Sequence, residues 1–337
     1  MLFAVAAGKF HAAVRSARRF ETIMFFSGFI RLSLAKKEKS AIIFKLIFSV
    51  VPFSPGAVKN MSIFSDPLSP WRQPLRFLYP ANWCKPGFEQ ALAYLQQHPE
   101  LRGESNLLTN SSGKLVWKIS LPEEFGGGSV AWKLCEGKVP RRYIINLSHP
   151  AREWRNYQAI ERLGVPAGEV LAFGETRKYH WKLVESFIVT RFIEGTRNGC
   201  DFMPGGVLRQ DTAMRRRFCA LIAPEIAKMH RHNFFHKALH PRNILYTGNT
   251  PDTMKVFFID VARCRIRLNF AMPYVVLFDL YTPLLDLQIP TEESLEFLRI
   301  YHDCFPECPF SFPELGNRLR KYRRHKKTFN VVDCGKS

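Results

Sequence analysis

The sequence lacks several features that mark common classes of protein. Its eight cysteines form no CxxC pair, which is typical of reduced thiols in a cytoplasmic protein and argues against a disulfide framework. Cys304 and Cys308 form a lone CxxxC without further ligands at metal-site spacing, so no metal site is expected there. The apolar run at residues 41–53 contains Lys45 and is too short to span a bilayer. The basic N-terminal region lacks the ordered segments of a signal peptide.

Acidic residues are also scarce, with 29 against 49 lysines and arginines, and the formal net charge is +20. Residues 1–60 hold ten basic residues against two acidic ones. The C-terminal tail is basic as well, through Arg318, Arg320, Lys321, Arg323, Arg324, Lys326 and Lys327. Such a tail can bind anionic lipid at ~1 kcal/mol per basic residue, although an ordinary solvated helix has the same composition. No nucleic-acid motif accompanies the charge, so we expect a peripheral membrane contact and no nucleic-acid partner.

Residues 236–245 read His-Lys-Ala-Leu-His-Pro-Arg-Asn-Ile-Leu, and Asp260 follows 17 residues after Asn243. The kinase catalytic loop H-R-D-L-x-x-x-N and its later metal-binding Asp have the same order. His236, Asn243 and Asp260 are kept here, but Ala238 stands where the catalytic Asp belongs. The sequence therefore has the frame of a nucleotide-handling site without its usual base.

Turn-forming residues at 247–252 separate two short apolar runs, 244–246 and 256–259. A hairpin of these runs would bring Asn243 and Asp260 together as two oxygen ligands for Mg²⁺. Taken singly, Asn243 reads as a turn residue, Asp260 as a strand-end cap and His236 as a core histidine. The spacing of all three favours the site.

Lys133 lies inside the apolar run 129–135, which predicts a strand with one lysine. Its candidate partner is Glu153, on a helix over residues 151–160 that ends before Gly164. An ion pair between them would fix the ammonium where nucleotide phosphates arrive. A solvated strand-end lysine and a surface glutamate remain the alternative.

Residues 126–128 are three glycines, but only four residues separate them from Lys133, which leaves no room for an intervening strand. We therefore predict a hairpin turn over residues 123–128, after a strand at 114–121. The loop Thr109–Gly113 is the better candidate for a lid over the phosphates.

Residues 186–195 predict a strand that runs into a linker, where the backbone of Arg191, Phe192 and Ile193 is placed to hold an adenine ring. A helix then leads to His236. Its apolar stripe reads as core and consists of Phe218, Leu221, Ile222, Ala223, Ile226 and Met229.

These motifs, together with the run Ile259-Asp260-x-x-Arg263 and the helix residues 152–154, resemble the bacterial lipopolysaccharide kinase family of the protein-kinase-like superfamily. The likeness covers about residues 105–285. It implies a two-lobed α+β fold, with a small antiparallel-sheet N-lobe that carries one helix and a mainly helical C-lobe. It also implies ATP and Mg²⁺ as cofactors, and a lipopolysaccharide core sugar or another anionic sugar-lipid as acceptor. Lys133 and Glu153 would be the phosphate-binding pair, and Asn243 and Asp260 the metal ligands.

Ala238 departs from the family pattern and leaves two readings. General-base assistance contributes typically ~10²–10⁴-fold, so a slow kinase is physically allowed. His240 could accept a proton or stabilise the phosphoryl oxygens, and Asp201 or Asp211 could supply the missing acid. The alternative is a pseudokinase, a nucleotide-binding regulatory or scaffold module. A phosphotransferase of the aminoglycoside or choline type is a weaker option, because a cationic acceptor does not suit a basic chain.

We expect five regions along the chain. Residues 1–60 form a basic apolar extension that is untranslated or dispensable, with an interfacial amphipathic anchor as the alternative. Residues 61–104 are an N-terminal flank, 105–194 the N-lobe, 195–316 the C-lobe and 317–337 the basic tail. The protein should act in the cytoplasm, peripheral to the inner face of the membrane.

Overall fold

The computed structural model describes residues 79–111, 113–136, 147–179, 182–266 and 272–322. By its internal contacts the chain divides into Met1–Ser62 and Ile63–Ser337, and all described residues belong to the second unit. The predicted extension and most of the basic tail lie outside the described residues. Within the described part, no helix is both long and apolar enough to cross a membrane.

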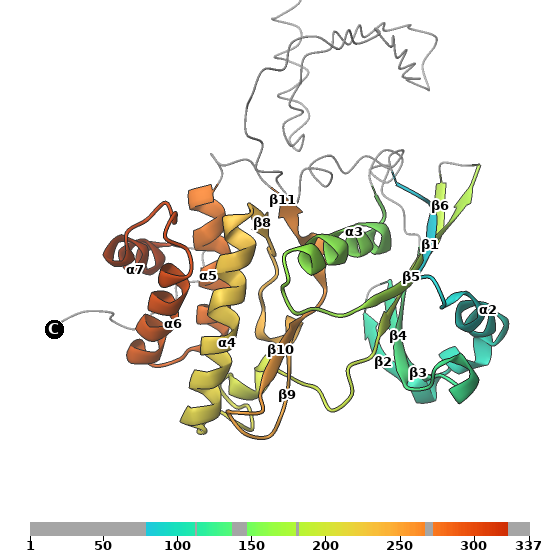
Figure 1. The fold of residues 1–337 in the computed structure, drawn as a ribbon, viewed down its shortest axis with the longest axis horizontal. Coiled ribbons are helices and arrows are strands. Elements are labelled where there is room, and N and C mark those ends of the chain that lie inside the picture. Colours follow the sequence, from blue (N-terminus) through green and yellow to red (C-terminus); the bar gives the residue numbers. More distant parts are fainter. Residues whose placement is uncertain (1–78, 112, 137–146, 180–181, 267–271, 323–337) are drawn as a thin grey trace, which may run out of the picture. The chain divides into compact units, whose positions relative to one another are not determined.

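The first half of the described chain forms a six-stranded antiparallel sheet in the order β1-β5-β6-β4-β3-β2 (Figure 1). Its strands are β1 (Asn82–Cys84), β2 (Leu107–Ser111), β3 (Lys114–Ser120), β4 (Ser129–Glu136), β5 (Val170–Lys178) and β6 (Lys182–Arg191). The strands predicted around Lys133 and before residues 123–128 are therefore present, and they pair with each other as the predicted hairpin.

The two faces of this sheet carry different side chains. Trp117 of β3 lies opposite Trp132 of β4, and both are buried in a small core beneath helix α2 (Glu89–Gln97). Val116 lies opposite Lys133, so Lys133 projects from the other face, because side chains alternate along a strand. The small core therefore fixes the face on which Lys133 lies.

Helix α3 (His149–Arg162) packs against β5 and β6 of the sheet. It begins at Ser148, whose hydroxyl accepts a hydrogen bond from the Ala151 N–H, and it ends before Gly164, which has a positive φ of 63°. Its apolar face is buried, and the Trp154 ring lies 4.8 Å from that of Phe173 on β5. The predicted helix is confirmed, and its packing determines which way Glu153 points.

The predicted loop Thr109–Gly113 is wrong over most of its length. Residues up to Ser111 belong to β2, which pairs with β3 at the edge of the sheet, and Gly113 with a φ of 78° remains in the turn. An edge strand tolerates the polar residues that the sequence reading took as loop formers.

The second half of the described chain is mainly helical. Its helices are α4 (Thr212–Arg231), α5 (Met272–Leu287), α6 (Thr291–Asp303) and α7 (Phe312–Lys321). Its short strands are β7 (Arg197–Asn198), β8 (Phe234–Phe235), β9 (Ile244–Thr247), β10 (Lys255–Phe258) and β11 (Arg265–Ile266). Sheet part and helical part together give the two-lobed α+β arrangement expected from the sequence (Figure 1).

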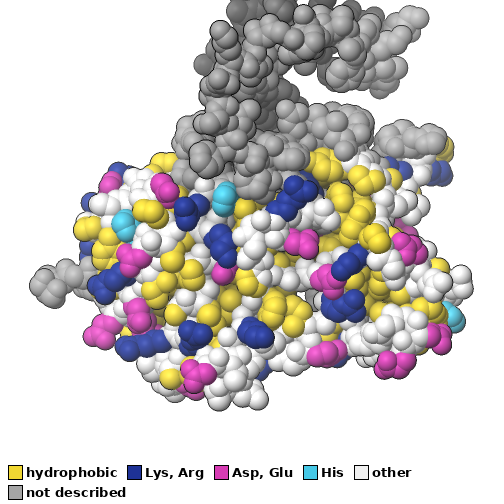
Figure 2. Space-filling model, in the orientation of Figure 1, with side chains coloured by type: hydrophobic (Ala, Val, Ile, Leu, Met, Phe, Trp, Pro, Cys, Tyr) yellow, Lys and Arg dark blue, Asp and Glu magenta, His cyan; other side chains and the backbone are white. Residues whose placement is uncertain are grey.

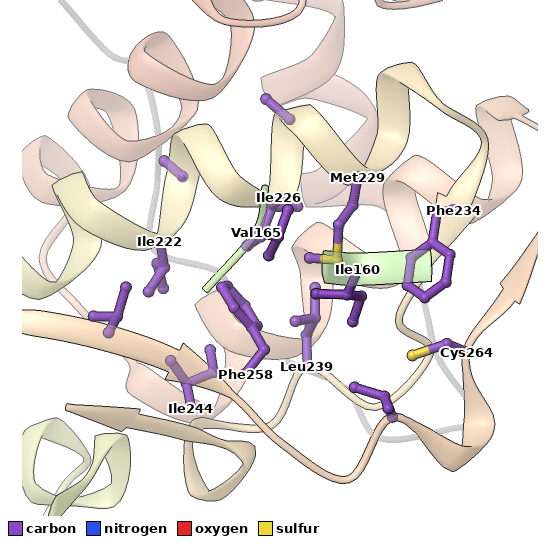
Figure 3. Packing of buried hydrophobic residues seen from close by; sticks show 14 of the residues in the cluster. Ile160, Val165, Ile222, Ile226, Met229, Phe234, Leu239, Ile244, Phe258 and Cys264 are labelled. Carbon is purple, nitrogen blue, oxygen red and sulfur yellow. The ribbon is translucent and has the colours of Figure 1, made fainter. Parts of the chain in front are cut away.

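The large core lies where α4 meets the β9–β10 hairpin. Ile222 and Ile226 from the predicted stripe of α4 pack with Ile244 of β9 and Phe258 of β10, and all four are fully buried (Figure 3). Leu239, from the loop that precedes the hairpin, is also fully buried in this cluster. The core thus anchors both the loop and the hairpin that carries Asn243 and Asp260.

Candidate active site

Lys133 is the centre of the site. Its Nζ donates to Glu153 Oε2 at 2.7 Å and Oε1 at 3.0 Å, and to Asp260 Oδ1 at 2.9 Å. The predicted Lys133–Glu153 ion pair is therefore present, and Asp260 joins it. Only 14% of the Lys133 side chain and 4% of the Glu153 side chain are exposed. One ammonium group thus links the sheet, helix α3 and the segment after β10.

The three groups shift one another's protonation. Burial disfavours the charged form of Lys133, but the Glu153 and Asp260 carboxylates outweigh it and raise the pKa of the ammonium. Burial also disfavours ionised Asp260, yet the Lys133 charge outweighs it and holds the pKa of that carboxyl well below its usual range. Burial raises the pKa of Glu153, and the Lys133 charge opposes that shift. The site therefore holds a charged lysine and an ionised aspartate at neutral pH.

Asn243 lies at the mouth of the predicted hairpin. Its neighbour Ile244 pairs with Phe258 in the β9–β10 ladder, and the Asn243 carbonyl accepts a hydrogen bond from the Ile259 N–H at 3.0 Å. Asp260 comes next and adopts the left-handed conformation, with a φ of 54°. The hairpin therefore places Asn243 and Asp260 at the same end, as the sequence predicted.

These two side chains fit a magnesium ion as a donor set. The Asn243 amide Nδ2 donates to the Ala238 carbonyl at 2.8 Å, so its Oδ1 points away from that bond and stays available as a ligand. Asp260 uses Oδ1 toward Lys133 and keeps Oδ2. Mg²⁺ commonly takes one or two protein oxygens and completes its shell with water and substrate phosphates. No group of three or more His, Cys, Asp or Glu in the described residues, Cys304 and Cys308 included, is arranged to hold a metal.

The loop that begins at His236 is hydrogen-bonded to helix α5. The His236 and Lys237 N–H groups donate to the two carboxylate oxygens of Asp279, at 2.7 and 2.8 Å. Asp279 is fully buried and lies 3.3 Å from His230 Nε2. Burial lowers the pKa of His236, so its imidazole is neutral and acts in packing. The loop is thus anchored at its start by one buried carboxylate.

Ala238 occupies the position at which a kinase loop carries its catalytic Asp. Ala238 is buried, with 4% of its surface exposed. His240 Nδ1 lies 2.6 Å from Asp286 Oδ2, also on α5. The acids considered from the sequence have other partners, because Asp201 accepts from the Tyr246 hydroxyl and Asp211 caps the N-terminus of α4. Of the acids that contact this loop, Asp279 bonds to its backbone and Asp286 contacts the side chain of His240.

The predicted adenine-binding segment begins at Arg191, the last residue of β6. The Arg191 N–H donates to the Glu169 carbonyl and the Phe192 N–H to the Ser129 carbonyl, at 2.8 and 3.0 Å. The Ile193 carbonyl accepts from the Thr196 hydroxyl at 2.8 Å. The structure brings Lys133, Glu153 and Asp260 into direct contact. The segment lies farther along the sheet, because Arg191 of β6 pairs with Val130 of β4, whereas Lys133 pairs with Ile188.

Sequence reasoning missed Asp279, Asp286 and Lys114. Two acids in an otherwise apolar helix are a signal for the first two, since a buried carboxylate needs a partner. Lys114 lies opposite Cys135 in the β3–β4 ladder, and its charge contributes to lowering the pKa of Asp260. A second cation therefore faces the site from β3.

A cavity of about 530 Å³ lies elsewhere, between the end of α3 and the start of β5. Trp83, Tyr157 and Gly168 are among the residues that line it, and no residue of the site does.

Three comparisons bear on the family. The model of the lipopolysaccharide kinase (Kdo/WaaP) family matches residues 133–301. Among solved structures, the chain is similar to "WaaP in complex with acyl carrier protein", with a TM-score of 0.52 and 16% sequence identity over 71% of this chain and 96% of that one. At this identity the likeness shows the fold, which is protein-kinase-like. No curated protein matches the sequence.

The family match begins at Lys133 and includes Glu153, the loop from His236, Asn243 and Asp260. It also spans both α5 acids and covers half of the chain. The chain therefore belongs to the lipopolysaccharide kinase (Kdo/WaaP) family.

Proposed function

We propose that this protein transfers the γ-phosphoryl group of ATP to a hydroxyl group of a lipopolysaccharide core sugar or a similar anionic sugar-lipid. The observation that carries the proposal is the contact of Lys133 with both Glu153 and Asp260, beside Asn243. Phosphoryl transfer depends mainly on positioning and charge neutralisation, and these residue types provide both.

Each side chain has a role in the proposal. Lys133 binds nucleotide phosphates, and Glu153 keeps its ammonium in place. Asn243 and Asp260 hold Mg²⁺, which neutralises charge on the phosphates when bound. The 2.9 Å contact between Lys133 and Asp260 supports this arrangement, because it brings the phosphate-binding and metal-binding groups together before any nucleotide arrives. Lys114 adds a second positive charge at the same face.

The adenine would lie against the segment after β6. The Arg191 and Phe192 N–H groups are engaged within the protein, so the Ile193 N–H is the donor that we assign to the base. Phe192 would contribute its ring, over which the Lys118 ammonium lies at 4.5 Å.

The acceptor is proposed as anionic, and the protein as acting at the inner face of the cytoplasmic membrane. The net charge of +20 supports an anionic partner through long-range attraction. On the face in Figure 2, lysines and arginines are interspersed with acidic residues, so the described surface there offers no single basic patch. The basic tail, most of which lies outside the described residues, stays our candidate for membrane contact.

The second candidate function is a pseudokinase that binds nucleotide without transferring phosphate. Ala238 favours it, because the catalytic loop has no carboxylate at the usual position. Both candidates require the nucleotide site, and they differ only in turnover.

Thermal unfolding with and without millimolar MgATP tests the nucleotide site. We expect stabilisation of the wild type and none of Asp260→Ala, with Asp252→Asn, an exposed residue of the β9–β10 turn, as the matched control. Transfer of labelled γ-phosphate to purified lipopolysaccharide core oligosaccharide then separates kinase from pseudokinase. A wild-type protein whose melting is unmoved by MgATP would contradict the kinase-site proposal.

A further inference from the structure

His240 and Asp286 form a pair that the nucleotide site does not require. His240 Nδ1 lies 2.6 Å from Asp286 Oδ2, and about a quarter of each side chain is exposed, 25% and 24%. We propose that His240 is the proton acceptor for the attacking hydroxyl and that Asp286 is its positioning residue. This inference rests on the proposed phosphotransferase function. In it, His240 takes the place of the carboxylate that is absent at position 238.

Helix α5 places Asp286 at the loop. Asp279 and Asp286 are seven residues apart, which is about two helical turns, so both leave the same face of α5. Asp279 accepts the His236 and Lys237 N–H groups, and Asp286 contacts the imidazole of His240. The two ends of the loop that contains Ala238 are thus held by two carboxylates of one helix.

The contact orients the imidazole. A carboxylate at 2.6 Å from Nδ1 accepts the N–H of that nitrogen, so the proton of a neutral ring stays on Nδ1. Nε2 then carries the lone pair and is the atom able to take a proton. Because the ring is partly exposed, a bound hydroxyl can reach it. This is the arrangement by which a carboxylate prepares a histidine as a base in many hydrolases.

Other described acids near the loop are occupied. Asp201 accepts from Tyr246 and pairs with Arg197, Asp211 caps α4, and Asp279 is fully buried under the loop. His240 immediately precedes the short helical turn Pro241–Asn243, so its imidazole and the Asn243 amide leave neighbouring positions of one turn. A role in stability does not account for the His240–Asp286 contact, because partly exposed contacts of this kind add little to stability and Asp279 already anchors the loop.

The acceptor O–H gives its proton to His240 Nε2 while its oxygen forms a bond to the γ-phosphorus of ATP. The bond from that phosphorus to the β,γ-bridging oxygen breaks, and ADP leaves with the electron pair. The imidazolium, stabilised by the Asp286 carboxylate, then releases its proton to water.

The test combines kinetics with a measurement that needs no acceptor. We expect His240→Ala to lower kcat for transfer to purified lipopolysaccharide core oligosaccharide by ~10²-fold, with the KM for MgATP unchanged. Asp286→Asn should lower kcat by roughly 10-fold through misorientation of the ring, and Asp286→Glu should recover part of the loss. Added free imidazole should restore part of the His240→Ala rate. Asp252→Asn serves as the matched control.

In ¹⁵N spectra of histidine-labelled protein, the His240 signal is assigned by its loss in His240→Ala. We expect the proton on Nδ1 in the wild type and a changed tautomer in Asp286→Asn. Melting curves of every variant, with His240→Gln as a second replacement, show that the fold is intact.

An unchanged kcat in His240→Ala, or an unchanged tautomer in Asp286→Asn, overturns the inference. If MgATP stabilises the wild type but no phosphate passes to the oligosaccharide or to water, the proton-acceptor role is overturned while the nucleotide site stands. If MgATP does not stabilise the wild type, the proposed function itself fails, and the base role fails with it.

Discussion

The Lys133 ammonium lies 2.9 Å from the Asp260 carboxylate, although the two residues are 127 positions apart in the chain. This contact joins the sheet lobe to the segment that follows the β9–β10 hairpin. Glu153 completes the cluster from α3. The groups that we assign to phosphate and to metal are therefore coupled in charge, and that coupling has consequences for stability.

The first prediction is a pH dependence that belongs to this ion pair. The pKa of Asp260 is lowered, so its contribution to stability is present above the ordinary aspartate pKa of ~3.9 and is lost as the pH falls below it. The pKa of Lys133 is raised, so its contribution is lost only as the pH rises above the ordinary lysine range. The unfolding free energy of the wild type minus that of Lys133→Met should therefore shrink from about pH 5 to about pH 3.

Urea unfolding of both proteins across that range is the measurement. Lys118→Met is the matched control, because Lys118 pairs with Glu194 near the surface and not with a buried acid. A difference between wild type and Lys133→Met that stays constant over this range would show that Asp260 is not held by Lys133 in solution.

The second prediction concerns the anchor beneath the catalytic loop. Asp279→Ala leaves the buried His236 N–H and the partly buried Lys237 N–H without their acceptor, which should lower the unfolding free energy by roughly 3–5 kcal/mol. Asp279→Asn keeps one oxygen acceptor and should cost less. Chemical denaturation measures both, with exposed Asp303→Asn as control. A loss below ~1 kcal/mol in Asp279→Ala would mean that water satisfies the loop.

The site residues that sequence reasoning found share a property. Asn243 and Asp260 flank one hairpin, and their relation follows from strand pairing between neighbouring segments. The Lys133–Glu153 pair follows from a strand and a helix close in sequence. The fold class followed from the resemblance to the lipopolysaccharide kinase family that these motifs carry.

What sequence reasoning missed depends on tertiary packing. Asp279 and Asp286 act on a loop about 40 residues earlier in the chain, with partner separations of 43 and 46 positions for His236 and His240, and no local pattern connects them. Asp201 and Asp211 were the acids considered from the sequence, and the fold gives each of them a structural partner. The error at Thr109–Gly113 has a different cause, since polar composition does not separate a loop from an edge strand.

The third prediction is that residues 1–60 contribute little to the stability of the rest. A chain that starts at Met61 should melt within about 3 °C of the full chain, the change expected from ~1 kcal/mol in a domain of this size. A chain that starts at Lys85 is the control. It lacks β1 and the Trp83 ring, which lies 5.8 Å from that of Trp154, so it should melt much lower. Circular dichroism measures all three chains, and a large drop for the Met61 chain would show that the extension packs on the domain.

The last prediction asks whether a carboxylate at position 238 can replace the proposed base. Ala238→Asp restores the residue type of the kinase loop, and general-base assistance contributes ~10²-fold or more. Introduced alone, it should raise turnover on lipopolysaccharide core oligosaccharide. Introduced into His240→Ala, it should bring the rate back to at least the wild-type level, because either group then supplies the proton acceptor.

Melting curves must accompany these rates, because Ala238 is buried. Its carbonyl also accepts the hydrogen bond from the Asn243 side-chain amide that orients the proposed metal ligand. A pseudokinase would show no turnover in any variant while MgATP still stabilised each one. If the wild type has a measurable rate and neither Ala238→Asp nor His240→Ala changes it, neither position takes part in proton transfer. The loop from His236 would then be a structural element, and the reacting groups would lie elsewhere.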